Sequence, residues 1–113
     1  MAASLFSADA IAVGNLTDLI TPAADATVTK TLYDSPSARL VLFAMDAGQR
    51  LTDHSSAKPA LVQVLDGSIE FEVGGQTHEL GPSGWVAMPA GEVHAVLATQ
   101  PSRFLLTLLK GGA

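Results

Sequence analysis

The sequence predicts an all-β protein, folded as a single sandwich or barrel of short strands. About nine short runs of strand length are separated by glycine and proline turns. No segment of ten or more residues shows a convincing helical period. The clearest run, 68–73, alternates apolar and polar residues, and the pair Gly74-Gly75 after it is typical of a two-residue hairpin turn. Short strands with turns at this spacing favour a β-sandwich or β-barrel.

The chain divides into an arm and a barrel. Residues 1–26 are rich in alanine, serine, threonine and aspartate, and we expect them to form an N-terminal arm. This arm lies against the barrel, or it packs at a dimer interface or exchanges a strand with a neighbour. In this arm, 11–13 is a candidate strand, and 15–20 is a strand or a helical turn. Residues 27–113 form the barrel domain. Its expected strands are 28–33, 39–45, 60–65, 68–73, 76–80, 85–88, 94–98 and 103–109.

Composition excludes several classes of protein. The 113 residues suit one domain, and 48% of them are hydrophobic. The net charge of −5 with six scattered basic residues argues against nucleic-acid binding, and no apolar run is long enough for a membrane helix. The chain has no cysteine and no signal-peptide pattern, so we expect a cytoplasmic protein. The last strand is apolar on both faces, which predicts a homodimer.

Two spaced motifs frame the middle of the chain. In the first, five residues separate Gly48 from His54, and the segment ends at the turn glycine Gly67. The second, from Pro89 to His94, has the spacing Pro-x-Gly-x-x-His. Together they resemble the two motifs of the cupin family, and the resemblance covers about residues 38–109. It implies a single small antiparallel β-barrel, the jelly roll or double-stranded β-helix that is also called RmlC-like.

The same resemblance implies a metal site, from which this chain departs. Metal-binding cupins use three histidines and one glutamate, and the matching positions here hold His54, Ser56, Ala60 and His94. Only the two histidines can serve as metal ligands, whereas a catalytic zinc site generally takes three protein ligands. Asp53 is adjacent to His54, and neighbouring residues of an extended chain point to opposite faces. We therefore do not expect Asp53 to be a metal ligand.

Three interpretations of His54 and His94 stay open. They hold a divalent metal weakly, or they act as hydrogen-bonding or acid–base groups in a metal-free pocket, or they have no function. Beyond the divalent metal of the first interpretation, the sequence implies no cofactor. A buried neutral histidine needs partners for both ring nitrogens, so the second and third interpretations require polar atoms nearby.

Strand parity predicts the pocket. Ala60 occupies the inward position of the missing glutamate, so residues two and four places later share its face, and the same holds after His94. The expected ligand pocket is lined by His54, Ser56, Ala60, Val62, Met88, His94 and Val96, with Phe43, Met45, Phe104 and Leu106 as further wall candidates. Such a pocket suits a small, partly apolar ligand with one or two polar atoms.

Three functions follow, in order of preference. The first is a cupin-like protein that binds a small molecule with little or no tightly held metal. The second is a small-molecule enzyme, such as an oxygenase, isomerase or epimerase, that uses His54 and His94, with a Zn, Fe, Mn or Ni ion or without metal. The third is a dimeric scaffold that does not catalyse a reaction. The sequence assigns no catalytic residue.

Other polar and aromatic residues have simpler interpretations. The hairpin at Gly74-Gly75 places His78 opposite Phe71, where we expect it to be half-buried against the ring. Trp85 covers a barrel end or a subunit interface, or alternatively stacks on a ligand. Four carboxylates are expected on turns or outward positions as a solvated face: Asp66, Glu70, Glu72 and Glu79.

Overall fold

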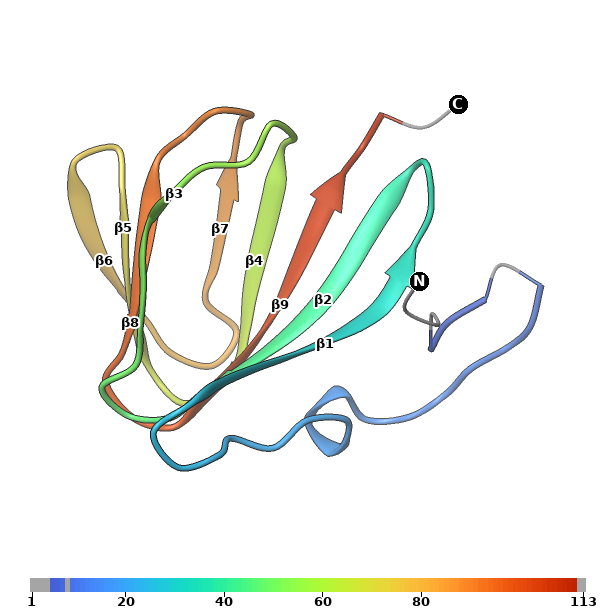
Figure 1. Ribbon diagram of the computed structural model, residues 1–113, viewed down its shortest axis with the longest axis horizontal. Coiled ribbons are helices and arrows are strands. Elements are labelled where there is room, and N and C mark those ends of the chain that lie inside the picture. The colour runs from blue at the N-terminus through green and yellow to red at the C-terminus, as the bar shows by residue number, and fades with distance from the viewer. Residues whose placement is uncertain (1–4, 8, 112–113) are drawn as a thin grey trace.

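The computed structural model describes residues 5–7 and 9–111, and nine β-strands in two sheets account for most of them (Figure 1). The strands are β1 (Thr27–Asp34), β2 (Ala38–Met45), β3 (Arg50–His54), β4 (Ala60–Asp66), β5 (Ile69–Val73), β6 (Gln76–Leu80), β7 (Trp85–Met88), β8 (His94–Ala98) and β9 (Ser102–Leu109). A single 3₁₀ helix, η1 (Leu16–Asp18), precedes them. No helix in the described part of the chain has the length and apolar character to span a membrane.

The two sheets face each other across one core. One has five strands in the order β1-β2-β9-β4-β7, and the other has four in the order β3-β8-β5-β6. Every strand pair is antiparallel. Figure 1 shows the four-stranded sheet on the left and the five strands of the other sheet side by side from the middle to the right. The predicted all-β, cupin-type antiparallel barrel is confirmed.

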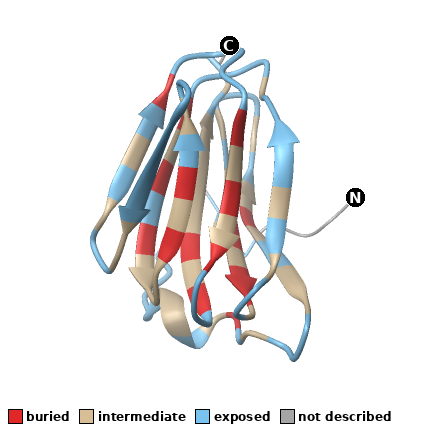
Figure 2. Cartoon of the chain, turned by 90° about the vertical axis from the view of Figure 1, so that its left-hand side faces the viewer, coloured by how far each residue is buried: buried red, intermediate tan, exposed pale blue. Residues whose placement is uncertain are grey.

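Alternation along the strands creates the core. In β4, residues Ala60, Val62 and Val64 are buried while their neighbours are not, and β5 and β8 repeat this pattern of buried bands (Figure 2). The predicted parity is therefore right for all three strands. The core cluster between the sheets contains Met45, Ala60, Val62, Val64, Ile69, Phe71, Met88, Val96, Ala98 and Phe104.

A second apolar cluster lies on the outside of the five-stranded sheet, beneath the arm. Ile20 of the arm packs with Leu32, Leu42 and Ala44, and Leu105 of β9 borders the same cluster. The guanidinium of Arg103 donates to the carbonyl oxygens of two arm residues, Thr17 and Ile20, the latter at 3.2 Å. The chain's own arm thus covers part of the apolar outer face of β9, which the sequence analysis assigned to a dimer partner.

Three local features differ in how well the sequence predicted them. The segment 11–13 is not a strand, because none of its residues forms a backbone hydrogen bond to the rest of the described chain. Within 15–20 the helical-turn alternative is right, since η1 closes with a hydrogen bond from Leu19 N–H to the Leu16 carbonyl. The strand β3 was not among the predicted strands, because its residues lack an apolar–polar alternation.

Candidate functional site

The two motif histidines meet on neighbouring strands. His54 at the end of β3 is the direct cross-strand partner of His94 at the start of β8. A register shift between Leu51 and His54 adds one residue to β3, so that both the leucine and the histidine face the interior. The imidazole centroids are 4.1 Å apart and the ring planes are inclined by 60°.

Hydrogen bonds to the backbone decide which ring nitrogens are available. His54 Nδ1 lies 3.0 Å from the Thr52 carbonyl oxygen, and His94 Nδ1 lies 3.2 Å from the Glu92 carbonyl oxygen. A carbonyl oxygen only accepts, so each Nδ1 carries the proton and donates it. The neutral forms of both rings therefore present Nε2 as an acceptor. The site therefore offers two hydrogen-bond acceptors, one on each of two rings whose centroids are 4.1 Å apart.

Burial and an aromatic neighbour keep His94 neutral. His94 is 8% exposed, and its ring stacks on Phe71 with 5.5 Å between centroids and 8° between planes. Desolvation lowers the pKa of His94 below its ordinary value of 6.5, the hydrogen bond to Glu92 raises it less, and the neighbouring His54 lowers it further. His54 itself is exposed. The pair thus joins one buried and one solvent-accessible imidazole.

This lowered pKa predicts a pH-dependent stability. Because the unfolded chain takes up the proton at a higher pH than the folded chain does, the free energy of unfolding should fall as the pH drops from about 6.5 through the folded-state pKa. Replacing His94→Gln should flatten this part of the profile. Denaturant titrations across this pH range measure the effect, with the exposed His78→Gln as the control. Parallel profiles for wild type and His94→Gln would contradict the assignment.

The remaining motif positions do not complete a metal site. The Ser56 hydroxyl accepts the Lys58 N–H at 3.0 Å, and Ala60 is a buried methyl group. Among the residues that the structure describes, no group of three or more His, Cys, Asp or Glu side chains is placed to hold a metal ion. The donors present therefore do not fit the four-ligand centre implied by the motif resemblance.

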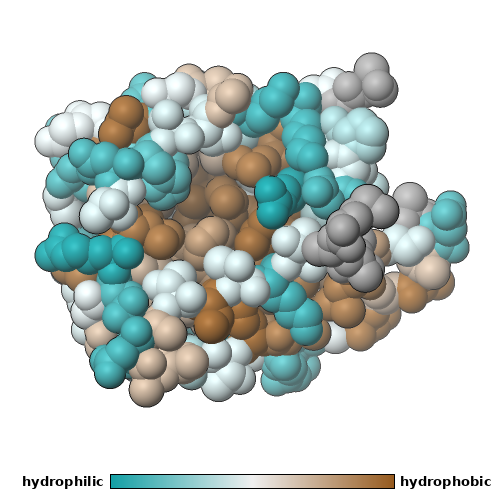
Figure 3. Space-filling model, viewed as in Figure 1, coloured by the Kyte–Doolittle hydropathy of each residue, from teal (hydrophilic) through white to brown (hydrophobic). Residues whose placement is uncertain are grey.

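The apolar residues of the predicted pocket are buried in the core between the sheets. Ala60, Val62, Met88 and Val96 all belong to the core cluster that also contains Phe71, on which His94 stacks. Ser56 is joined to the second motif through its carbonyl oxygen, which accepts the Gly91 N–H at 2.8 Å. In the space-filling view of Figure 3, hydrophobic residues lie at the bottom of a hollow near the middle of the molecule. The histidine pair borders the apolar core.

Phe71 belongs to this site, although it was not among the predicted pocket residues. Its predicted cross-strand partner His78 is confirmed, but His78 is exposed and not half-buried, because β6 is an edge strand with only Leu80 partly buried. The ring that stacks on Phe71 belongs to His94 instead. Trp85, also on an edge strand, is 64% exposed.

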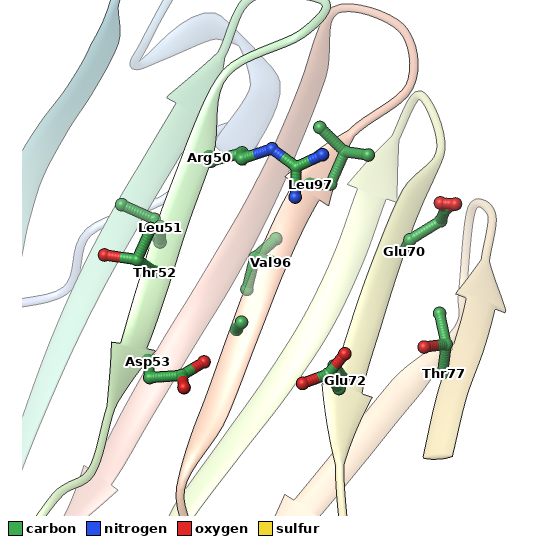
Figure 4. Close-up of a pocket in the computed structure, with 10 residues that line it drawn as sticks. Arg50, Leu51, Thr52, Asp53, Glu70, Glu72, Thr77, Val96 and Leu97 are labelled. Carbon is green, nitrogen blue, oxygen red and sulfur yellow. The ribbon is translucent and has the colours of Figure 1, made fainter. Parts of the chain in front are cut away.

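A groove of about 350 Å³ lies on the opposite, outer face of the four-stranded sheet (Figure 4). Ala95 of β8 is short, so the longer side chains of the flanking strands rise on either side of it, Asp53 on one and Glu72 on the other. Arg50 and Glu70 flank Leu97 in the same way. Asp53 therefore faces away from the histidine pair, and Glu70 and Glu72 lie on the outer face as expected.

Fold and site together define a class of protein. The molecule is a small antiparallel β-barrel that keeps two imidazoles, His54 and His94, at its inner edge. The family model described as Cupin domain matches residues 41–108, which is more than half of the chain, and the chain belongs to the cupin family. A comparison with curated proteins found no match.

Solved structures agree with this assignment. The conserved protein SPY1581 from Streptococcus pyogenes is 27% identical, with a TM-score of 0.85, and the alignment covers 99% of this chain and 98% of that one. A cupin 2 conserved barrel domain protein from Leptotrichia buccalis is 28% identical, with a TM-score of 0.81 and coverages of 86% and 47%. The DMSP lyase DddQ from Ruegeria pomeroyi is 24% identical, with a TM-score of 0.69 and coverages of 74% and 46%, and shares the fold.

Proposed function

We propose that this protein binds a small, partly apolar molecule that carries a hydroxyl group, beside the His54–His94 pair and without a tightly held metal. The observation that carries the proposal is the hydrogen bonding of both Nδ1 atoms to backbone carbonyl oxygens. Two neutral imidazoles held in this way are acceptors, so they favour a ligand that donates. The apolar residues beside them suit the rest of such a ligand.

The donor set supports a metal-poor site. With Ser56 engaged by Lys58 and Ala60 unable to coordinate, an ion would have only two protein ligands and would depend on water for the others. We therefore regard the metal site as degenerate. The chain's lack of cysteine suits a reducing compartment, and we place the protein in the cytoplasm.

The second candidate is an enzyme. His94 is buried with a lowered pKa while its partner His54 is exposed, and a pair of titratable groups in unlike environments is a common arrangement for acid–base chemistry. The lyase named above shares only the fold at 24% identity, so it brings no activity to this chain. The binding function comes first because no further catalytic group is assigned beside the pair.

The test compares hydroxyl ligands with their ethers. Untagged protein is assayed for metals by mass spectrometry, and thermal shifts are recorded with a panel of small phenols and alcohols and with the methyl ether of each. We expect substoichiometric metal, and stabilisation by a hydroxyl compound but not by its ether. His54→Ala should weaken binding about tenfold, the size of one lost hydrogen bond of about 1.4 kcal/mol. His78→Ala is the matched control, because this histidine is exposed on another strand.

Two results would overturn the proposal. One is a stoichiometric metal that is lost in both His54→Ala and His94→Ala, which would instead support the metal-dependent enzyme. The other is equal stabilisation by each phenol and its methyl ether, because an acceptor pair must distinguish them.

A further inference from the structure

The groove on the outer face of the four-stranded sheet is lined by charges of both signs. It has a volume of about 350 Å³, and its lining includes the guanidinium of Arg50 and the carboxylates of Asp53, Glu70 and Glu72 (Figure 4). Within the part of the chain that the structure describes, none of these four side chains forms an ion pair or a side-chain hydrogen bond. Their charges are therefore available to a ligand in the groove.

Two carboxylates stand at one end of this groove, with a short residue between them. Ala95 of β8 pairs directly with Glu72 of β5, and Asp53 of β3 lies on the other side of β8. Figure 4 shows the carboxylates of Asp53 and Glu72 on either side of β8. The two negative charges repel each other, and a cation above the methyl group of Ala95 would be attracted by both.

The other end of the groove carries the positive charge. Arg50 is the direct cross-strand partner of Leu97, and Figure 4 shows its guanidinium extended toward this leucine. A guanidinium binds a carboxylate through two parallel hydrogen bonds. Ala95 and Leu97 are two residues apart on the same face of β8, so the two ends of the groove are separated by about 6.5 Å.

We propose that this groove is a second small-molecule site, which binds ω-amino acids of the length of δ-aminovalerate. The ligand carboxylate meets Arg50, the ligand ammonium lies between Asp53 and Glu72, and the methylene groups lie over Leu97 and Ala95. Five single bonds of about 1.5 Å separate the carboxyl carbon of δ-aminovalerate from its nitrogen, which gives roughly 6 Å in the extended form. The charges of the ligand thus match those of the groove in sign and in spacing.

This inference goes beyond the ligand proposed for the histidine pair, because the two sites lie on opposite faces of the sheet. Asp53 faces the groove, whereas its neighbour His54 faces the interior beside His94. The sheet between them keeps the two ligands apart. Binding in the groove can therefore be tested independently of binding at the histidine pair.

The test is an NMR titration of the backbone amides of the full chain with δ-aminovalerate at millimolar concentrations. We expect saturable shifts in β3, β5 and β8, and at least about fivefold weaker binding of pentylamine, valerate and glycine, which lack one charge or the required length. Arg50→Gln and Glu72→Gln should each weaken binding of δ-aminovalerate about fivefold, the effect of one partly exposed charge pair. Arg39→Gln is the matched control, because this arginine is exposed on β2 of the other sheet.

Two further variants keep the proposal testable. Ala95→Leu fills the floor of the groove without removing a charge, so it should abolish binding. His54→Ala removes a ring from the inner face and should leave binding of δ-aminovalerate unchanged. Absence of saturable binding, equal binding of pentylamine or glycine, unchanged binding in Arg50→Gln and Glu72→Gln, or loss of binding in His54→Ala would each overturn the proposal.

Discussion

Replacing Gly67 with alanine is expected to cost at least about 3 kcal/mol of folding free energy, a large share of the roughly 5–15 kcal/mol that stabilises such a domain. Gly67 has φ +83°, a conformation that a side chain disfavours. An added Cβ would also lie 2.2 Å from Ser102 Oγ, 2.4 Å from the Pro101 carbonyl oxygen and 2.6 Å from Ser102 Cα. Two of these atoms are backbone, so neither can move aside alone.

The other terminal glycine of the first motif is the matched control. Gly48 has φ +86°, but an added Cβ there meets nothing within 4 Å, so Gly48→Ala should cost only the conformational penalty of about 1–2 kcal/mol. Denaturant unfolding of the two variants measures the difference, which isolates the steric term. Equal losses would show that backbone conformation alone decides the need for glycine at residue 67.

Phe71→Ala should destabilise the fold by about 3–5 kcal/mol, as expected when a buried phenylalanine is truncated. Phe71 is fully buried in the core cluster, and β8 and β6 flank its strand on either side. The substitution should also raise the pKa of His94 toward its ordinary value of 6.5, because removal of the stacked ring admits water beside the imidazole.

Phe71→Leu separates the two effects. Leucine keeps most of the buried volume, so the variant should lose less stability and remain folded near neutral pH. NMR titration of the histidine ring protons then follows His94 in wild type and variant, with exposed His78 as the internal reference. A variant in which the pKa of His94 is unchanged would show that burial by other residues, and not Phe71, lowers it.

The strand interiors could be predicted well from the sequence. Alternation in 68–73 correctly placed Ile69 and Phe71 on the buried face, and the hairpin at Gly74-Gly75 correctly set Phe71 opposite His78. Both glycines have positive φ, as a tight two-residue turn requires. These features depend on neighbours within a few residues, so the local sequence contains the information needed to predict them.

The candidate site could be predicted only in part. The motif spacing identified His54 and His94 as candidates. Their direct pairing depends on a register shift in β3, which no local sequence pattern predicts. The stacking of Phe71 on His94 needs β8 and β6 on opposite sides of β5, which is a property of the sheet. The exposure of Trp85 likewise follows from its place on an edge strand.

By itself, the amino-acid sequence determined an all-β chain, the faces of its central strands and the two motif histidines, His54 and His94. Only the tertiary structure decided which side chains lie beside the histidine pair, and that the arm covers β9 while Ile11 and Val13 stay exposed. The physical reason is the separation along the chain of the residues that interact. Turns and alternation act over a few residues, whereas contacts between strands forty residues apart depend on how the whole chain packs.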